Sequence, residues 1–134
     1  MKPSVLVTHE ECLQHVTPPG HPEQVARLEY ILEALKDVNL SRVSAPMAAE
    51  DDILRIHPRE HINYLQDAVP DTGFKSIDGD THISSGSLTA AYRAAGGVLR
   101  AVDLVLSGEA KNAFVAVRPP GHHAERQTAM GFCL

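Results

Sequence analysis

Two adjacent histidines, His122 and His123, follow an Arg-Pro-Pro-Gly stretch near the end of the sequence. Imidazole titrates nearest neutral pH, so a pair of imidazoles can divide the acid and base roles of a proton-transfer reaction. Adjacent side chains tend to diverge, which disfavours chelation of one metal ion by this pair. Spacing alone favours two loop histidines without a role. The two prolines fix φ, however, and Gly121 permits a tight backbone approach, so this stiff turn after an apolar run indicates a preorganised catalytic pair.

A second group of polar residues, Asp78 and Asp80, lies in the stretch 70–86, which is dense in Gly, Asp, Ser and Thr. This composition predicts a long loop, and a loop of that length inside a compact domain is usually functional or mobile. The two carboxylates could bind calcium or accept hydrogen bonds from the N–H groups of a substrate. Solvated loop acids without a role are the alternative, and spacing alone favours it.

Other histidines offer weaker metal-binding patterns. His57 and His61 are four residues apart, a spacing that can bind zinc on a helix. Pro58 is expected to begin that helix and to leave His57 outside it, which disfavours a metal site. Cys12 and His15 form a lone C-x-x-H, which is too short a pattern to predict zinc. The sequence contains no phosphate-binding GxxxxGK and no HExxH motif.

The elements that must hold these residues follow from hydrophobic periodicity. Short apolar runs predict strands, and three- and four-residue spacing of apolar residues predicts helices. The predicted strands are 4–9, 42–47 and 112–117, and the predicted helices are 21–37, 48–57, 58–69 and 87–108. This alternation favours an α/β fold with a parallel sheet and helices on its faces. Ligands bind at the carboxyl ends of strands in such sheets, and His122 and His123 follow the last predicted strand.

Two of the predicted helices carry further signals. Pro22 is expected at the first position of the helix 21–37, with Glu23 complementing the helix dipole. Gly96 and Gly97 lie inside the helix 87–108, where each would cost about 1 kcal/mol relative to alanine. Their presence predicts close approach of this helix to a neighbouring element.

Length and composition restrict the class of protein. The chain has 134 residues, 43% of them hydrophobic and 22% charged, which is typical of one globular domain. The net charge of −5 does not favour a nucleic-acid surface. Two cysteines outside any CxxC pair favour a reducing, cytoplasmic compartment without a disulfide framework. No stretch approaches the ~20 apolar residues of a membrane span.

The stretch RPPGHHAERQTAMGFCL resembles the active-site signature of the histone deacetylase superfamily. It is most similar to class II-type deacetylases and to bacterial acetylpolyamine and acetoin-utilisation relatives. GHPEQVARLEYIL is similar to the family's early HPE…R helix, and DGDTHISSGSLTAAYRAAGGVLRAVDLVLSGE resembles the loop and helix before the histidine pair. The resemblance implies the arginase/deacetylase fold, an open parallel sheet with helices on both faces. Residues 1–134 would form the N-terminal part of a single deacetylase domain, with about three of its strands.

This resemblance also implies zinc-dependent hydrolysis of an acetyl-lysine-like or acetylpolyamine amide. His123 would be the general base and then the acid for the leaving amine, and His122 would be its electrostatic partner. Gly131 and Phe132 would line the narrow channel that takes the acyl-lysine stem.

Two further positions carry roles by the same resemblance. Asp80 would grip substrate amides from the rim, with Thr81 as the neighbouring possibility, and Arg27 would sit near the inner foot of the channel.

The resemblance places the metal ligands elsewhere. The family's zinc ligands, an Asp and a His in a D-x-H stretch and a further Asp, follow the GFC motif, as does its transition-state tyrosine. None is therefore expected among residues 1–134. The alternative is a truncated, catalytically inactive piece that acts only in binding or assembly, with a homo-oligomer covering its open sheet edge. The substrate, whether protein, polyamine or another acyl-amine, stays open.

Overall fold

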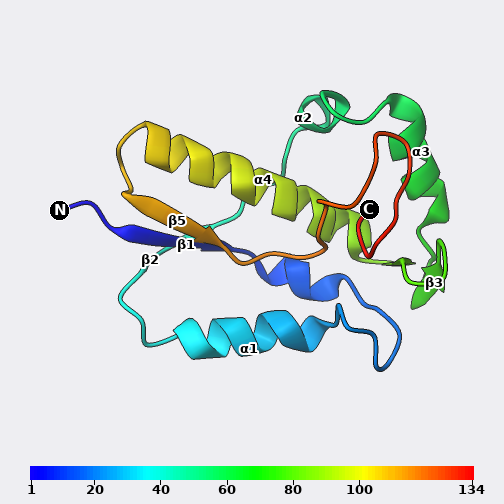
Figure 1. Cartoon of the computed structure of the whole chain (residues 1–134), viewed down its shortest axis with the longest axis horizontal. Coiled ribbons are helices and arrows are strands. Elements are labelled where there is room, and N and C mark those ends of the chain that lie inside the picture. The colour runs from blue at the N-terminus through cyan, green and yellow to red at the C-terminus, as the bar shows by residue number, and fades with distance from the viewer.

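The computed structural model describes residues 1–134 and contains a three-stranded parallel sheet (Figure 1). Its strands are β1 (Ser4–Thr8), β2 (Ser41–Ser44) and β5 (Asn112–Val115), in the order β2-β1-β5. Both neighbouring pairs are parallel. β1 is the central strand, which explains why its sequence is a short continuous apolar run. The predicted parallel α/β architecture is confirmed.

Helices cover both faces of this sheet. α1 (Val25–Leu35) lies on one face and α4 (Ser87–Leu106) on the other (Figure 1). Because successive side chains of a strand point to opposite faces, β1 serves both layers. Val5 packs in one core cluster with Leu104 of α4, whereas Leu6 packs in a second cluster with Leu28 of α1.

The remaining elements surround one end of the sheet. They are a short 3-10 helix η1 (Glu10–Gln14), the helices α2 (Glu50–Leu54) and α3 (Arg59–Ala68), and the strands β3 (Phe74–Ser76) and β4 (His82–Ser84). The prediction of a structureless loop over 70–86 is wrong, because β3 and β4 form an antiparallel hairpin there. Its strands have only three residues each, too short for a period-2 signal in a polar stretch. Ile83 is nonetheless fully buried and packs against Leu65 of α3.

The first helix begins later than predicted. α1 starts at Val25 with Gln24 as its N-cap, so Pro22 and Glu23 precede the helix. The expectation that Glu23 complements the dipole of the first turn is therefore wrong. Glu23 is instead a buried residue with its own ionic partner, described below.

The two glycines of α4 mark close approaches, as predicted. A Cβ on Gly96 would lie 2.0 Å from the carbonyl oxygen of Pro46, in the segment that crosses the helix after β2. The Ala48 N–H donates to the carbonyl of Tyr92 across the same crossing, at 3.0 Å. Gly97 faces the sheet, where a Cβ would lie 3.5 Å from Cγ1 of Val7.

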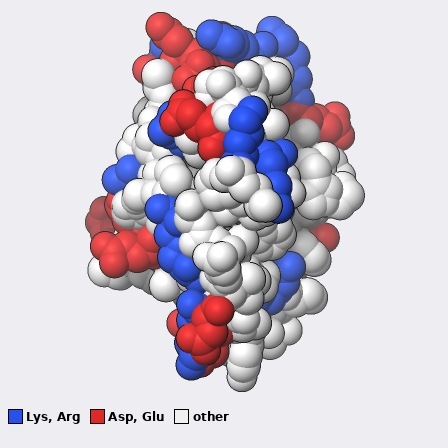
Figure 2. Space-filling view, turned by 90° about the vertical axis from the view of Figure 1, so that its left-hand side faces the viewer, with Lys and Arg blue, Asp and Glu red and all other residues white.

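The surface is mixed in charge and partly apolar. Figure 2 shows acidic and basic side chains interspersed over the face that carries the N-terminus. The outer side of α4 leaves Val98, Val102 and Leu106 exposed, and Phe114 is exposed on β5. β5 is also an edge strand without a partner on its outer side. No helix combines the length and the apolar character needed to cross a membrane.

Replacing Gly96 by alanine should destabilise the fold, because the new methyl group would overlap backbone atoms of Pro46 and Ala48. We expect a loss of about 1–3 kcal/mol in the free energy of unfolding, measured by urea titration followed by circular dichroism. Gly79→Ala is the matched control, since a Cβ there meets nothing within 4 Å. Equal losses in the two variants would contradict the crossing as the cause.

Candidate active site

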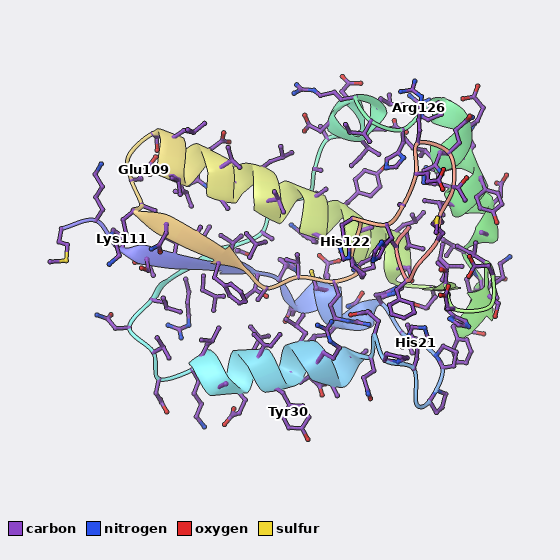
Figure 3. All side chains as sticks on the ribbon, in the orientation of Figure 1. His21, Tyr30, Glu109, Lys111, His122 and Arg126 are labelled. Carbon is purple, nitrogen blue, oxygen red and sulfur yellow. The ribbon has the colours of Figure 1, made fainter.

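A pocket follows the carboxyl end of β5, where the alternation of elements predicts a site. It is lined by Asp80, Pro120, His122, His123, Gly131 and Phe132. Figure 3 shows His122 at the end of the sheet away from Glu109 and Lys111, which directly precede β5. The structure therefore brings five of the six predicted site residues together, although their catalytic and binding roles stay predictions.

The histidine pair is exposed and tightly arranged. The ring centroids of His122 and His123 are 4.2 Å apart, with 53° between the ring planes. The backbone N–H of His123 donates to Sγ of Cys133 at 3.4 Å. A Cβ on Gly131 would lie 2.8 Å from Cβ of His123, so only glycine allows the turn at 131 to lie this close to the ring.

The backbone around Phe132 is strained. The N–H of Cys133 donates to the carbonyl of Met130 at 3.0 Å, which closes a four-residue turn. Both central residues have positive φ, 59° at Gly131 and 72° at Phe132, as in a type I′ turn. A bulky residue rarely adopts this region, and such strain is held where the surrounding structure over-determines it.

Thr81 links this turn to Asp80. Its hydroxyl accepts from the N–H of Phe132 at 3.1 Å and donates to Oδ1 of Asp80 at 3.0 Å. Thr81 is fully buried, whereas Asp80 is exposed. Of the two residues predicted to grip substrate amides, only Asp80 is therefore open to solvent.

Arg27 does not line the pocket. Its side chain is 54% exposed, and Nη1 donates to Oε1 of Glu23 at 2.9 Å. The same carboxylate has a second, buried partner in Arg118, the residue that precedes the Pro-Pro-Gly turn. Nε and Nη2 of Arg118 donate to Oε1 and Oε2 of Glu23 at 3.0 and 2.6 Å, a bidentate pair.

Arg118 also satisfies its other donors inside the protein. Nη1 donates to the carbonyls of Cys12 and His15, and Nη2 donates to that of Glu23. Arg118, which is 1% exposed, thus joins three segments of the chain: the one after β1, the one before α1 and the one after β5.

His15 extends this buried network. Nδ1 of His15 lies 2.7 Å from Oγ of Ser87, the first residue of α4. Burial, reinforced by the positive charge of Arg118, lowers the pKa of His15 to about 4. The imidazole is therefore neutral at pH 7, and His15 is a structural residue.

His57 and His61 have the spacing that can bind zinc on a helix, although Pro58 disfavours a metal site there. Pro58 is the N-cap of α3, so His57 lies outside the helix as expected. The rings of His57 and His61 stack, with centroids 4.5 Å apart. Residues 1–134 contain no group of three or more His, Cys, Asp or Glu side chains that could hold a metal ion.

Comparison with known proteins now identifies the family. The sequence model of a family described as "Histone deacetylase domain" matches residues 21–134. This chain belongs to the histone deacetylase family. A "Probable deacetylase" of Archaeoglobus fulgidus is 37% identical over 96% of this chain and 37% of its own length. A "Histone deacetylase-like amidohydrolase" of Pseudomonas aeruginosa is 41% identical over 89% of this chain and 33% of its own length.

Solved structures of the histone deacetylase family agree with this assignment. A crystal structure of the HDA15 HD domain matches the whole chain with a TM-score of 0.90 and 28% sequence identity, over 40% of that chain. The arginase/deacetylase-like fold is therefore confirmed. The chain spans about a third of the length of these curated relatives.

The sequence analysis did not predict the buried network of His15, Glu23 and Arg118, which leads into the turn that carries the histidine pair. A signal existed for Arg118, because a cation that directly follows the apolar run NAFVAV requires a buried partner. No local pattern identifies Glu23 as that partner.

Replacing Glu23 by glutamine should strongly destabilise the protein, because it leaves the Arg118 guanidinium buried without a counter-charge. We expect a loss of about 3–5 kcal/mol, measured by urea unfolding. Arg27→Gln removes the exposed partner of the same carboxylate and should cost less than about 1 kcal/mol. The interpretation fails if both variants lose the same stability.

Stability should fall as the pH is lowered from about 6.5 to 4. The folded pKa of His15 lies below its ordinary value, so over this range the unfolded state binds more protons and gains stability relative to the native state. The contribution of His15 is about 3 kcal/mol. Burial also lowers the pKa values of His61 and His82, which act in the same direction. Urea unfolding at several pH values measures this loss. The free energy of unfolding of His15→Asn should depend less on pH than that of the wild type. An unchanged pH dependence in this variant would contradict the role of His15.

Proposed function

We propose that this chain carries the histidine half of the active site of a zinc-dependent amidohydrolase. Its substrates would be acetyl-lysine-like amides or acetylpolyamines. The single observation that supports this most is the pocket shared by His122, His123, Asp80 and Phe132, in a chain that belongs to the histone deacetylase family.

His123 is the proposed proton-transfer residue. Hydrolysis of an acetyl amide needs a base that takes a proton from the attacking water and an acid that gives a proton to the leaving amine nitrogen. Imidazole can perform both steps in turn. His123 faces the turn at Gly131, which is one wall of the pocket. The ring of His122, 4.2 Å away, is the proposed electrostatic partner of His123.

Asp80 and Phe132 are the proposed substrate-binding residues, with Gly131. Oδ1 of Asp80 accepts from Thr81, which leaves Oδ2 of this exposed carboxylate able to accept from a substrate N–H. The Phe132 ring supplies an apolar surface against which the aliphatic stem of an acylated amine can pack. Gly131 adds no side chain and so keeps the channel narrow. Arg27 lies outside this pocket, so its proposed place at the channel foot rests on the family resemblance alone.

The zinc ion would act as the Lewis acid of the reaction. The side chains of residues 1–134 do not fit it, because they gather no set of three metal-ligating groups. We therefore assign none of the steps above to residues that hold zinc, and we propose that these 134 residues alone neither bind zinc tightly nor turn over substrate. Cys12 and Cys133 are free thiols, which supports a reducing, cytoplasmic location.

A piece that acts only in binding or assembly is the second candidate. It is favoured by the exposed Val98, Val102 and Leu106 of α4 and by the unpaired edge of β5, surfaces that a partner or a second copy could cover.

A fusion experiment separates the two candidates. Residues 1–134 would be joined to the downstream part of the Pseudomonas aeruginosa relative, and deacetylation of an acetyl-lysine peptide would be measured with zinc. We expect turnover by the fusion and none above a chelated control by the isolated chain. His123→Ala in the fusion should lower kcat by about 100-fold or more, whereas His9→Ala should leave it unchanged. Turnover that persists in the His123 variant contradicts the proposed role, and an inactive fusion favours the binding piece.

A further inference from the structure

His21 is a buried residue that the proposed reaction does not use. It lies in the segment before α1, at the same end of the molecule as His122 (Figure 3). Nε2 lies 2.8 Å from the backbone carbonyl oxygen of Asp80, and Nδ1 accepts from the backbone N–H of Glu23 at 3.0 Å. A carbonyl only accepts and an amide N–H only donates, so these partners fix a neutral ring with its proton on Nε2.

The ring of His21 also contacts two aromatic side chains. It meets Phe132 edge-on, with centroids 4.8 Å apart and 69° between the planes. It meets His82 of β4 in the same way, at 5.2 Å and 85°. One imidazole thus touches both Phe132, a wall of the pocket, and the backbone of Asp80, its exposed acid.

These contacts close a ring of four residues. Nε2 of His21 donates to the backbone carbonyl of Asp80, and the carboxylate of Asp80 accepts from the hydroxyl of Thr81. That hydroxyl accepts from the backbone N–H of Phe132, and the Phe132 ring contacts the ring of His21. The members come from three segments that are distant in the sequence. Removing any one of them would free the strained turn at Phe132 to relax away from Asp80.

We propose that His21 is a positioning residue that fixes the spacing between Asp80 and Phe132, and so sets the entrance for the acylated amine. This inference rests on the proposed function, which assigns the two residues to substrate binding. His21 makes no hydrogen bond to His122 or His123, so its loss should weaken substrate binding and leave the histidine pair in place.

NMR on the 134-residue chain tests the proposal. His21→Phe keeps an aromatic ring and removes both hydrogen bonds, whereas His21→Gln returns an amide donor near the place of Nε2. His9→Phe is the matched control, because Nδ1 of His9 accepts from the N–H of Glu11 in the same local pattern, outside the pocket. The readouts are hydrogen exchange of the Phe132 amide and the Kd for a short peptide amide containing Nε-acetyl-lysine.

We expect His21→Phe to speed exchange of the Phe132 amide about tenfold and to weaken peptide binding by a similar factor. His21→Gln should recover most of both, and His9→Phe should match wild type. The proposal would be overturned if the Phe132 amide of His21→Phe exchanged at the wild-type rate. It would also be overturned if exchange of this amide rose in the variant while its affinity for the peptide stayed unchanged. If wild type binds no peptide while exchange responds as expected, the positioning role stands and the assignment of Asp80 and Phe132 to substrate binding fails.

Discussion

The buried ion pair between Arg118 and Glu23 is the interaction on which the site depends. A guanidinium taken out of water is tolerated only if its charge and all its donors are satisfied, and here a bidentate carboxylate and three backbone carbonyls satisfy them. Because these acceptors belong to separate segments, the guanidinium draws those segments together. The Pro-Pro-Gly turn that follows Arg118 is thereby anchored at its base, and the histidine pair projects from a fixed point.

The residues at the exposed end of the pocket, Asp80 and Phe132, are held by a different kind of contact. An imidazole, a threonine hydroxyl, a backbone amide and an aromatic ring connect the residues there, and the carboxylate of Asp80 is the charged group among them. Thr81 is buried and Asp80 is exposed, so this network ends at a carboxylate that is open to solvent. The buried ion pair thus anchors the backbone that leads to the histidine pair, whereas contacts of single side chains connect Asp80 to Phe132.

The sequence predicted the layers well because their signals are local. The apolar run at β1 and the stripes of α1 and α4 are patterns of neighbouring residues, and the glycines of α4 predicted a close approach without identifying its partner. The motifs also predicted which residues would meet in the pocket. The hairpin within 70–86 was missed because its strands are short and polar. The pairing of Glu23 with Arg118 was missed because the two residues are 95 positions apart and no periodicity connects them. The left-handed turn at Phe132 was missed because its central pair, Gly-Phe, lacks the Asn-Gly signature of such turns.

The sheet order β2-β1-β5 has a consequence for biosynthesis. The central strand β1 is synthesised before both of its neighbours, and β2, α1, α4 and the hairpin lie between β1 and β5 in the sequence. Contacts between residues so far apart in the sequence form slowly, and the backbone N–H and C=O groups on one edge of β1 stay unpaired until β5 has been synthesised. During that interval the unpaired edge of β1 can pair with a strand of another chain, and covering this edge would protect the nascent polypeptide from aggregation.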